Sequence, residues 1–270
     1  MLKKDIMELA AKVREEAPLV HNITNYVTVN DCANCILAVG GSPIMADDIE
    51  EAKDITAVSK ALVLNIGTLN KRTIDSMLSS GKTANQLGIP VVFDPVGAGA
   101  SAFRNDTTKK ILEQVKLSII RGNLSEVAFI AGLSSNTKGV DVSEEDEKKD
   151  KVQIAQKVAE QFHCTVAITG KEDIISDGKR TALIRNGHPI MAKVTGTGCM
   201  TTAITGAYCG VHKDAFVAAV TGIAAMGIAG ELSYEKNQDK GTGSFHIGII
   251  DELSKLNSEA IKERIKLEEL

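Results

Sequence analysis

Residues 89–101 read IPVVFDPVGAGAS, an apolar, β-branched run that ends in an acid and is followed by a glycine-rich loop. A short, continuous apolar run is typical of a strand that is covered on both faces, as in a parallel sheet. Asp94 then stands at the carboxyl end of a buried strand, where ligands bind in open α/β sheets. Alternatively, Asp94 only caps the loop.

The same pattern recurs along the chain and predicts alternating strands and helices. Further apolar runs lie at residues 61–66, 117–120 and 165–169. Segments with helical spacing lie at residues 71–87, 101–115 and 123–131. The turn at 177–179 (DGK) separates 173–177 from 180–184 and predicts an antiparallel hairpin at one edge of the sheet. Residues 198–230 are small and apolar and predict two interior helices.

Composition narrows the class of protein. With 270 residues, of which 43% are hydrophobic, we expect one α/β domain over residues 1–270. The net charge of −4 and the lack of a Lys/Arg cluster predict no nucleic acid partner. The N-terminus reads as an amphipathic helix, and no apolar run reaches the roughly 18 residues of a membrane span. We therefore expect a cytoplasmic protein without membrane contact.

Two other features favour structural roles. Residues 142–151 (VSEEDEKKDK) predict a solvated loop and the start of a helix. Cys32 and Cys35 lie on one face of a segment, 26–39, that looks helical, and the sequence offers no second pair of cysteines or histidines to complete a zinc site. The sequence contains five cysteines, and this odd number does not suggest a disulfide framework. We expect core thiols.

Residues 194–200 read VTGTGCM and open a helix rich in alanine and threonine. Glycines at such a junction let a ligand approach the backbone, and the N–H groups of the first helical turn favour an anion. Residues 196–199 therefore predict an anion hole, with the pKa of the Cys199 thiol depressed by the helix terminus. The alternative is a plain turn with a buried cysteine.

Residues 121–126 (RGNLSE) also run from a strand end into a helix. Asn123 and Glu126 fit a capping box, so local structure alone could explain both. In the functional alternative, Arg121 binds nucleotide phosphate, while Asn123 and Glu126 hold a hydrated Mg²⁺.

These three elements follow three strands and should converge on one rim of the sheet. Acids for a metal and amides for phosphate are the groups that phosphoryl transfer needs. The sequence contains no G-x-x-x-x-G-K-[ST] motif, which excludes a P-loop kinase.

Six ordered motifs together resemble the hydroxyethylthiazole kinase family of the ribokinase-like superfamily. They are HNITNYV (21–27), GGSPIMADDIEE (40–51), VVFDPVGAGAS (91–101), RGNLSEV (121–127), AITGKEDIISDG (167–178) and VTGTGCMTTAITGA (194–207). The resemblance implies a three-layer α/β/α sandwich with a mostly parallel sheet. It also implies ATP-dependent phosphorylation of the primary alcohol of 4-methyl-5-(2-hydroxyethyl)thiazole in thiamin salvage, with Mg²⁺. A homotrimer with active sites near subunit boundaries is implied as well.

The resemblance also implies roles for individual residues. Arg121 and Thr169 would contact ATP, and Asp94 and Glu126 would organise Mg²⁺. The remaining residues are Gly196, Thr197 and Gly198 in the anion hole, Cys199 as the catalytic residue beside it, and Asn25, Met45 and Gly196 in the thiazole pocket.

Two alternatives remain open at this point. One is a related kinase that acts on a pyridoxal or hydroxymethylpyrimidine alcohol; Cys199, where sugar kinases carry aspartate, argues against it. The other is a catalytically silent binding protein, which would not need the metal and phosphate groups.

Overall fold

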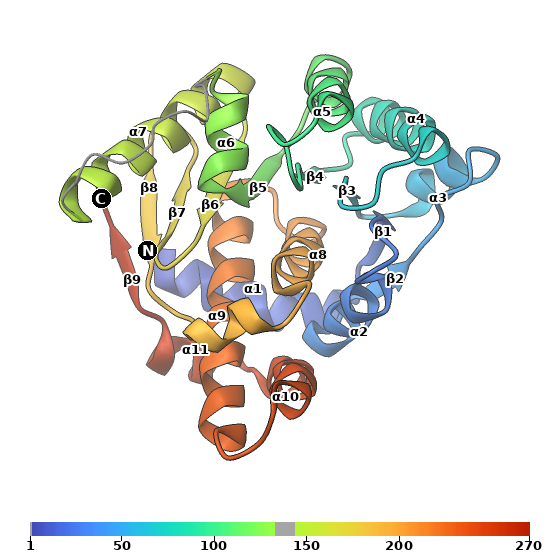
Figure 1. Cartoon of the computed structure of the whole chain (residues 1–270). Coiled ribbons are helices and arrows are strands. Elements are labelled where there is room, and N and C mark those ends of the chain that lie inside the picture. Colours follow the sequence, from blue (N-terminus) through green and yellow to red (C-terminus); the bar gives the residue numbers. More distant parts are fainter. Residues whose placement is uncertain (1, 133–143) are drawn as a thin grey trace.

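The computed structural model describes residues 2–132 and 144–270 (Figure 1). In this part of the chain, the strands form one sheet in the order β2-β1-β3-β4-β5-β6-β7-β8-β9. Their bounds are β1 Leu19–Ile23, β2 Ser42–Ile44, β3 Ala61–Asn65, β4 Val91–Asp94, β5 Ile119–Asn123, β6 Thr165–Thr169, β7 Asp173–Ser176, β8 Thr181–Ile184 and β9 Leu267–Glu269. Strands β1 to β6 pair in parallel, and β7 to β9 add antiparallel strands at one edge.

Helices cover both faces of the sheet. One layer holds α3 Ala52–Val58, α4 Lys71–Leu87, α5 Ala102–Gln114, α6 Leu124–Ile130 and α7 Glu144–Phe162. The other holds α1 Leu2–Glu16, α2 Val29–Val39, α8 Thr197–Cys209, α9 Ala215–Asn237, α10 Thr242–Lys255 and α11 Ser258–Arg264, with the short 3₁₀ helix η1 Pro189–Lys193 before α8. The α/β/α sandwich with a mostly parallel sheet is therefore confirmed.

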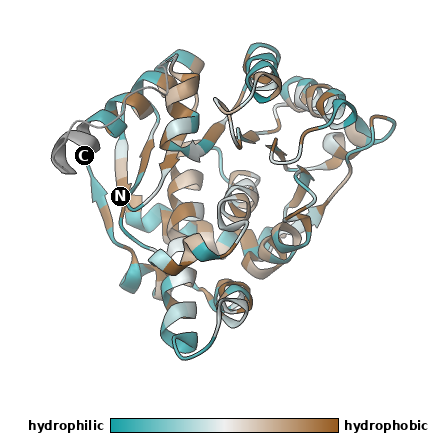
Figure 2. Cartoon of the chain, in the orientation of Figure 1, coloured by the Kyte–Doolittle hydropathy of each residue, from teal (hydrophilic) through white to brown (hydrophobic). Residues whose placement is uncertain are grey.

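Side chains alternate in direction along each strand and form two separate hydrophobic cores, one on each face of the sheet. In β4, Val92 packs into the cluster beneath α8 and α9, whereas its neighbour Phe93 packs into the cluster beneath α4 and α5. Successive side chains of a strand point to opposite faces, so a run with no polar break is buried on both sides. Figure 2 shows brown, hydrophobic residues in the central strands and teal, hydrophilic residues on the outer helices.

Most elements lie where the sequence predicts them, including β6, α4 and the antiparallel hairpin β7–β8. Helix α7 begins at Glu144, which confirms the predicted helix start; the loop predicted at residues 142 and 143 lies outside the described residues. Strand β1 is missing from the prediction because its centre carries His21 and Asn22, two buried polar residues. Strand β2 contains proline and is only three residues long.

The predicted core thiols and the predicted interior helices are also confirmed. Cys32 and Cys35 are free, buried thiols in α2. Helix α9 is long and apolar enough to cross a membrane by composition, yet 83% of its most apolar window is buried inside the protein. It packs against β5 to β8 and against α8 and α10, so it serves as the central helix of its layer.

Candidate active site

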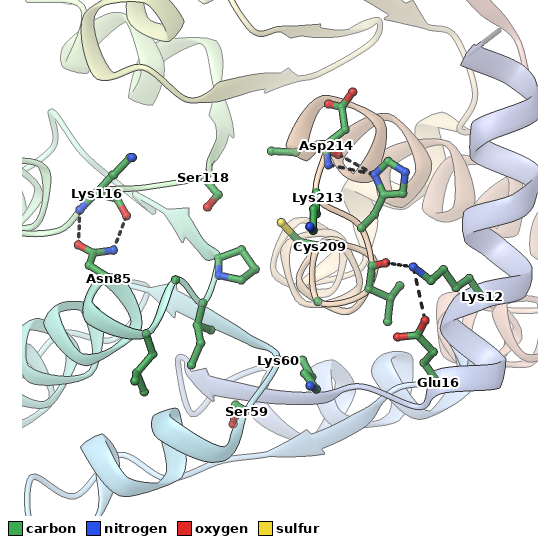
Figure 3. A pocket seen from close by; sticks show the side chains of 18 of the residues that line it. Lys12, Glu16, Ser59, Lys60, Asn85, Lys116, Ser118, Cys209, Lys213 and Asp214 are labelled. Carbon is green, nitrogen blue, oxygen red and sulfur yellow. Dashed lines mark hydrogen bonds and ion pairs between the residues drawn. The ribbon is translucent and has the colours of Figure 1, made fainter.

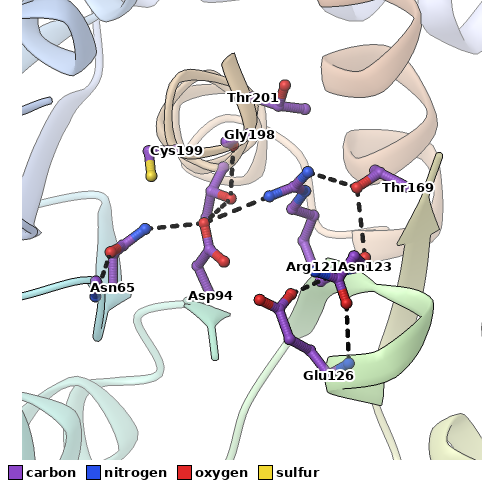
Figure 4. A network of polar contacts seen from close by, with 12 residues as sticks. Asn65, Asp94, Arg121, Asn123, Glu126, Thr169, Gly198, Cys199 and Thr201 are labelled. Carbon is purple, nitrogen blue, oxygen red and sulfur yellow. Dashed lines mark hydrogen bonds and ion pairs between the residues drawn. The ribbon is translucent and has the colours of Figure 1, made fainter. Parts of the chain in front are cut away.

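The carboxyl ends of the parallel strands bring the predicted polar residues together (Figure 4). Asn65 at the end of β3 is the register partner of Asp94 at the end of β4. Asn123 at the end of β5 is the register partner of Thr169 at the end of β6. The start of α8 lies across this rim, and its Thr202 bonds to Asp94. The predicted convergence on one rim is thus present.

Asp94 is wholly buried, and its two carboxylate oxygens differ sharply in their environment. Oδ2 accepts hydrogen bonds from Asn65 Nδ2 at 2.9 Å and Thr202 Oγ1 at 2.8 Å, and it lies 3.6 Å from Arg121 Nη1. Oδ1 has no partner among the described residues. Burial raises the pKa of the Asp94 carboxyl to about 6, although Arg121 opposes the shift. The protein thus fixes one oxygen and leaves the hydrogen-bonding capacity of the other unused among the described residues.

Arg121 crosses the rim between Asp94 and Thr169. Its Nη2 donates to Thr169 Oγ1, and its Nε is buried without a partner in the described structure. The guanidinium also lies against the start of α8, where a Cβ on Gly198 would be 2.5 Å from Nη1. A planar cation beside a helix N-terminus is suited to binding phosphate oxygens.

We expect Arg121→Lys to raise the KM for ATP about tenfold and the KM for the acceptor alcohol by much less. A lysine ammonium keeps the charge but cannot form the paired bonds of a guanidinium. Steady-state kinetics with each substrate varied in turn provide the measurement. Arg180→Lys is the matched control, because Arg180 pairs with Asp177 and Asp214 away from this rim. Equal changes in both KM values would contradict the predicted contact between Arg121 and ATP.

The predicted anion hole is the uncapped N-terminus of α8. Its N-cap, Gly196, has a φ of +86° and no side chain to bond the first-turn N–H groups. These groups are free for an anion, and the helix dipole favours negative charge there. Only glycine fits, because φ is left-handed and a Cβ would overlap the methyl group of Thr28.

The prediction that the helix terminus depresses the pKa of Cys199 is wrong. Burial raises the pKa of this thiol, and the nearby Asp94 carboxylate adds to the rise. Hydrogen bonds from Thr28, Asn25 and Asn65 act in the opposite direction without prevailing. The measured contact is 3.2 Å from Asn25 Nδ2 to Cys199 Sγ. The thiol is therefore protonated at neutral pH, because burial disfavours the charged thiolate.

The capping box predicted for Asn123 and Glu126 is present. Asn123 Oδ1 accepts from the Glu126 N–H at 3.0 Å, and Glu126 Oε2 accepts from the Asn123 N–H at 2.7 Å. Glu126 Oε1 also accepts from the Gly97 N–H at 2.8 Å, so this carboxylate ties the loop after β4 to the start of α6. The described residues contain no cluster of three or more His, Cys, Asp or Glu side chains around a metal position.

Two cavities lie along this rim, and the larger one has the first turn of α8 in its lining. One, of about 200 Å³, is lined by Met45, Asn22, Thr24, Tyr26 and Thr68. The other, of about 840 Å³, contains Arg121, Thr169, Thr197 and Gly198, with an apolar wall that includes Met226. The first is the size of a small heterocycle, and the second has room for a nucleotide.

Three contributors to this region were not predicted. Asn65 and Thr202 fix Asp94, as described above. Asp173 lines the larger cavity, accepts from the Gly170 N–H at 2.9 Å, and has its pKa raised to about 7 by burial. Asn65 is the only polar residue of the predicted run 61–66, but the sequence does not show that this run pairs with the strand of Asp94.

His21 holds the segment that carries Met45. It is fully buried, its Nε2 lies 2.7 Å from the Ala46 carbonyl oxygen, and its Nδ1 lies 2.8 Å from Thr56 Oγ1. A carbonyl only accepts, so Nε2 donates. Burial lowers the pKa of His21, which keeps the ring neutral in this structural role.

A cavity of about 1200 Å³ lies at the opposite rim of the sheet (Figure 3). Its lining includes Lys12, Lys60, Lys116 and Lys213. Helices α1, α3, α4 and α8 end beside it, so their carbonyl ends account for the lysines by favouring positive charge. None of the predicted site residues line it.

Comparisons with known proteins agree with the resemblance. A family model described as the hydroxyethylthiazole kinase family matches residues 10–259. A hydroxyethylthiazole kinase of Clostridium beijerinckii is 60% identical over 268 residues, covering 98% of this chain and 97% of the relative. One of Ruminiclostridium cellulolyticum is 58% identical, covering 99% and 98%.

Solved structures extend this similarity to the fold. The structure of a hydroxyethylthiazole kinase from Pyrococcus horikoshii superposes with a TM-score of 0.90 at 39% identity, with 99% of each chain covered. An ADP complex of Bacillus subtilis pyridoxal kinase superposes with a TM-score of 0.61 at 16% identity, covering 83% of this chain and 95% of that one. The second similarity shows a shared fold alone.

Proposed function

This chain belongs to the hydroxyethylthiazole kinase family, and we propose that the rim formed by β3 to β6 and the start of α8 is its active site. The enzyme phosphorylates the primary alcohol of 4-methyl-5-(2-hydroxyethyl)thiazole in thiamin salvage, with ATP as the phosphate donor. The observation that supports this location best is the uncapped N-terminus of α8, whose first turn lines the larger cavity together with Arg121.

Each cavity suits one substrate. The larger one would take ATP, with Arg121 and Thr169 at its phosphates. The smaller one would take the thiazole, with Met45 against the ring. We assign Asn25, which contacts Cys199, and Gly196 to the same thiazole site. During transfer, the phosphoryl group would lie beside the N–H groups of Gly196, Thr197 and Gly198. These groups would stabilise the charge on its oxygens.

The residues present fit a hydrated Mg²⁺. Asp94 Oδ1 is a buried carboxylate oxygen without a protein partner, and the Glu126 carboxylate is close enough to raise the pKa of Asp94. Magnesium prefers one or two carboxylates and retains several waters. Asp94 and Glu126 would hold the ion, and the oxygens of Glu126 are themselves positioned by backbone N–H groups of Gly97 and Asn123. When bound, Mg²⁺ would neutralise phosphate charge.

Cys199 would act beside the anion hole as a positioned, protonated thiol. Loose phosphoryl transfer depends mainly on positioning and on charge stabilisation, so proton removal from the alcohol contributes little. The thiol donates or accepts one hydrogen bond near the alcohol while Asn25 holds its sulfur.

We expect Cys199→Ala to lower kcat about tenfold without abolishing turnover. This loss is smaller than the usual contribution of a general base. Cys199→Asp should stay active, because the α8 N-terminus accommodates an added negative charge. Both kcat values are measured with the thiazole alcohol at saturating ATP. A folded, substrate-binding aspartate variant without activity would contradict the equivalence of the two side chains.

Assembly and location are further parts of the proposal. Tyr26 and Val27, next to Asn25, are 78% and 55% exposed, which is consistent with a trimer whose active sites lie near subunit boundaries. One continuous sheet is consistent with a single domain over residues 1–270. Use of ATP and five free thiols suit the cytoplasm, and the net charge of −4 argues against a nucleic acid partner.

An alcohol panel tests the substrate. The protein is incubated with ATP and Mg²⁺ and, separately, with hydroxyethylthiazole, hydroxymethylpyrimidine or pyridoxal, and kcat/KM is measured from ADP release. We expect the thiazole to be preferred by at least 10²-fold, since a site built for one set of contacts rejects alternatives strongly. A higher kcat/KM for either of the other alcohols would overturn the assignment.

A further inference from the structure

Asn65 sits between the phosphate half and the alcohol half of the proposed site. It is 2% exposed at the end of β3, and Figure 4 shows Asp94 between Asn65 on one side and Arg121 on the other. The family roles described above leave Asn65 without a function. A buried amide costs free energy unless it is hydrogen-bonded, so its bonds indicate its purpose.

The orientation of the Asn65 amide is fixed by a backbone donor. The Gly67 N–H, which can only donate, lies 2.9 Å from Oδ1. Nδ2 must then face Asp94 Oδ2, to which it donates at 2.9 Å. With Thr202 donating to the same oxygen, both bonds hold Oδ2, whereas Oδ1 is left without a partner among the described residues.

The same amide also orients Asn25. The Thr28 N–H donates to Asn25 Oδ1 at 3.2 Å, so Nδ2 of Asn25 faces the site. One of its hydrogens goes to Asn65 Oδ1 at 3.0 Å and the other to Cys199 Sγ at 3.2 Å. An unbroken chain of hydrogen bonds thus runs from Asp94 through Asn65 and Asn25 to Cys199.

We propose that Asn65 is a positioning residue that holds the Asp94 carboxylate and the Asn25 amide in one fixed arrangement, keeping the two halves of the site in register. This inference rests on the proposed function. Because a displacement of about 1 Å at a reacting centre can cost about 10²-fold in rate, such a residue affects turnover without touching substrate.

Asn65→Asp and Asn65→Ala separate the two bonds. Aspartate has the same size and keeps the oxygen that accepts from Gly67 and Asn25, but it replaces the donor to Asp94 with a second carboxylate. We expect it to lower kcat about 10²-fold while the dissociation constant for the thiazole, measured by calorimetry without nucleotide or metal, stays within twofold. Alanine removes both bonds and should also weaken thiazole binding, roughly fivefold.

Two threonines of α8 provide the comparison. Thr202→Val removes the other donor to Asp94 and should lower kcat with little effect on thiazole binding. Thr205→Val is the matched control, since among the described residues Thr205 Oγ1 bonds only the Thr201 carbonyl one turn earlier. This variant should leave both quantities unchanged. Thermal unfolding verifies that each variant folds.

The outcomes distinguish this inference from the proposed function. If the wild type does not phosphorylate the thiazole, the function itself fails. If the wild type is active but Asn65→Asp retains its kcat, or Asn65→Ala binds the thiazole as tightly as the wild type, Asn65 does not position the site. Because Asn65→Asp and Thr202→Val preserve side-chain volume, the test holds even if Asn65→Ala does not fold.

Discussion

Asp94→Asn is expected to lower kcat by about 10²–10³-fold and, at the same time, to make the protein more stable. Asparagine can keep an oxygen at the Oδ2 position for Asn65 and Thr202, so the local bonds survive. What is lost is the charge on Oδ1, the oxygen that has no partner among the described residues. Turnover falls because that charge is proposed to face the metal and the transferring phosphate.

The gain in stability follows from the pKa. In the folded protein the Asp94 pKa is about 6, above the ordinary value near 3.9, so ionisation costs the folded state on the order of 1–3 kcal/mol at pH 7. This penalty is absent below about pH 4 and complete above about pH 6. Denaturant unfolding in metal-free buffer should therefore show a difference between variant and wild type that shrinks from pH 7 to pH 5.

A different result would be informative. If Asp94→Asn were less stable than the wild type at pH 7, the carboxylate would be stabilised by its neighbours rather than strained by burial. If its kcat were unchanged, Asp94 would not belong to the catalytic site.

Gly196→Ala is expected to lower kcat by at least about 10²-fold and to reduce stability by about 1–3 kcal/mol. Alanine is strained at a φ of +86°, and its Cβ would overlap Thr28. Relief of the overlap moves the first turn of α8 away from the phosphate position. Steady-state kinetics and denaturant unfolding give the two values.

Gly243→Ala is the control for this substitution. Gly243 lies in the first turn of α10, where a Cβ would have no atom within 4 Å. Alanine there should leave kcat unchanged and slightly raise stability, because it restricts the unfolded chain. An active Gly196→Ala variant would mean that the α8 N-terminus does not bind the transferring group.

The sequence predicts much of this architecture because parallel strands have a simple signature. The run that ends in Asp94 is apolar at every position before the acid, and the rule that ligands bind at carboxyl ends identifies the correct rim. Strand β1 escapes the same reasoning because His21 and Asn22 are polar yet buried, and the partners of His21, Ala46 and Thr56, are brought near only by the fold.

The parts of the site that escaped prediction depend on three-dimensional surroundings. Asn65 belongs to an apolar run, and only the register of β3 against β4 places it beside Asp94. The pKa of Cys199 is raised by burial and by the nearby Asp94 carboxylate, neither of which the local sequence shows. The capping box at Asn123 and Glu126 is local and was predictable from four residues.

The most direct test of the account is to identify the product. Wild-type protein is incubated with ATP, Mg²⁺ and hydroxyethylthiazole, and the products are followed by phosphorus NMR and mass spectrometry beside Asp94→Asn. We expect a phosphomonoester of the thiazole alcohol and one ADP per product, formed only when ATP and Mg²⁺ are both present and greatly slowed in the variant. ATP consumption without a thiazole phosphomonoester, or undiminished product formation by Asp94→Asn, would contradict phosphoryl transfer at this site.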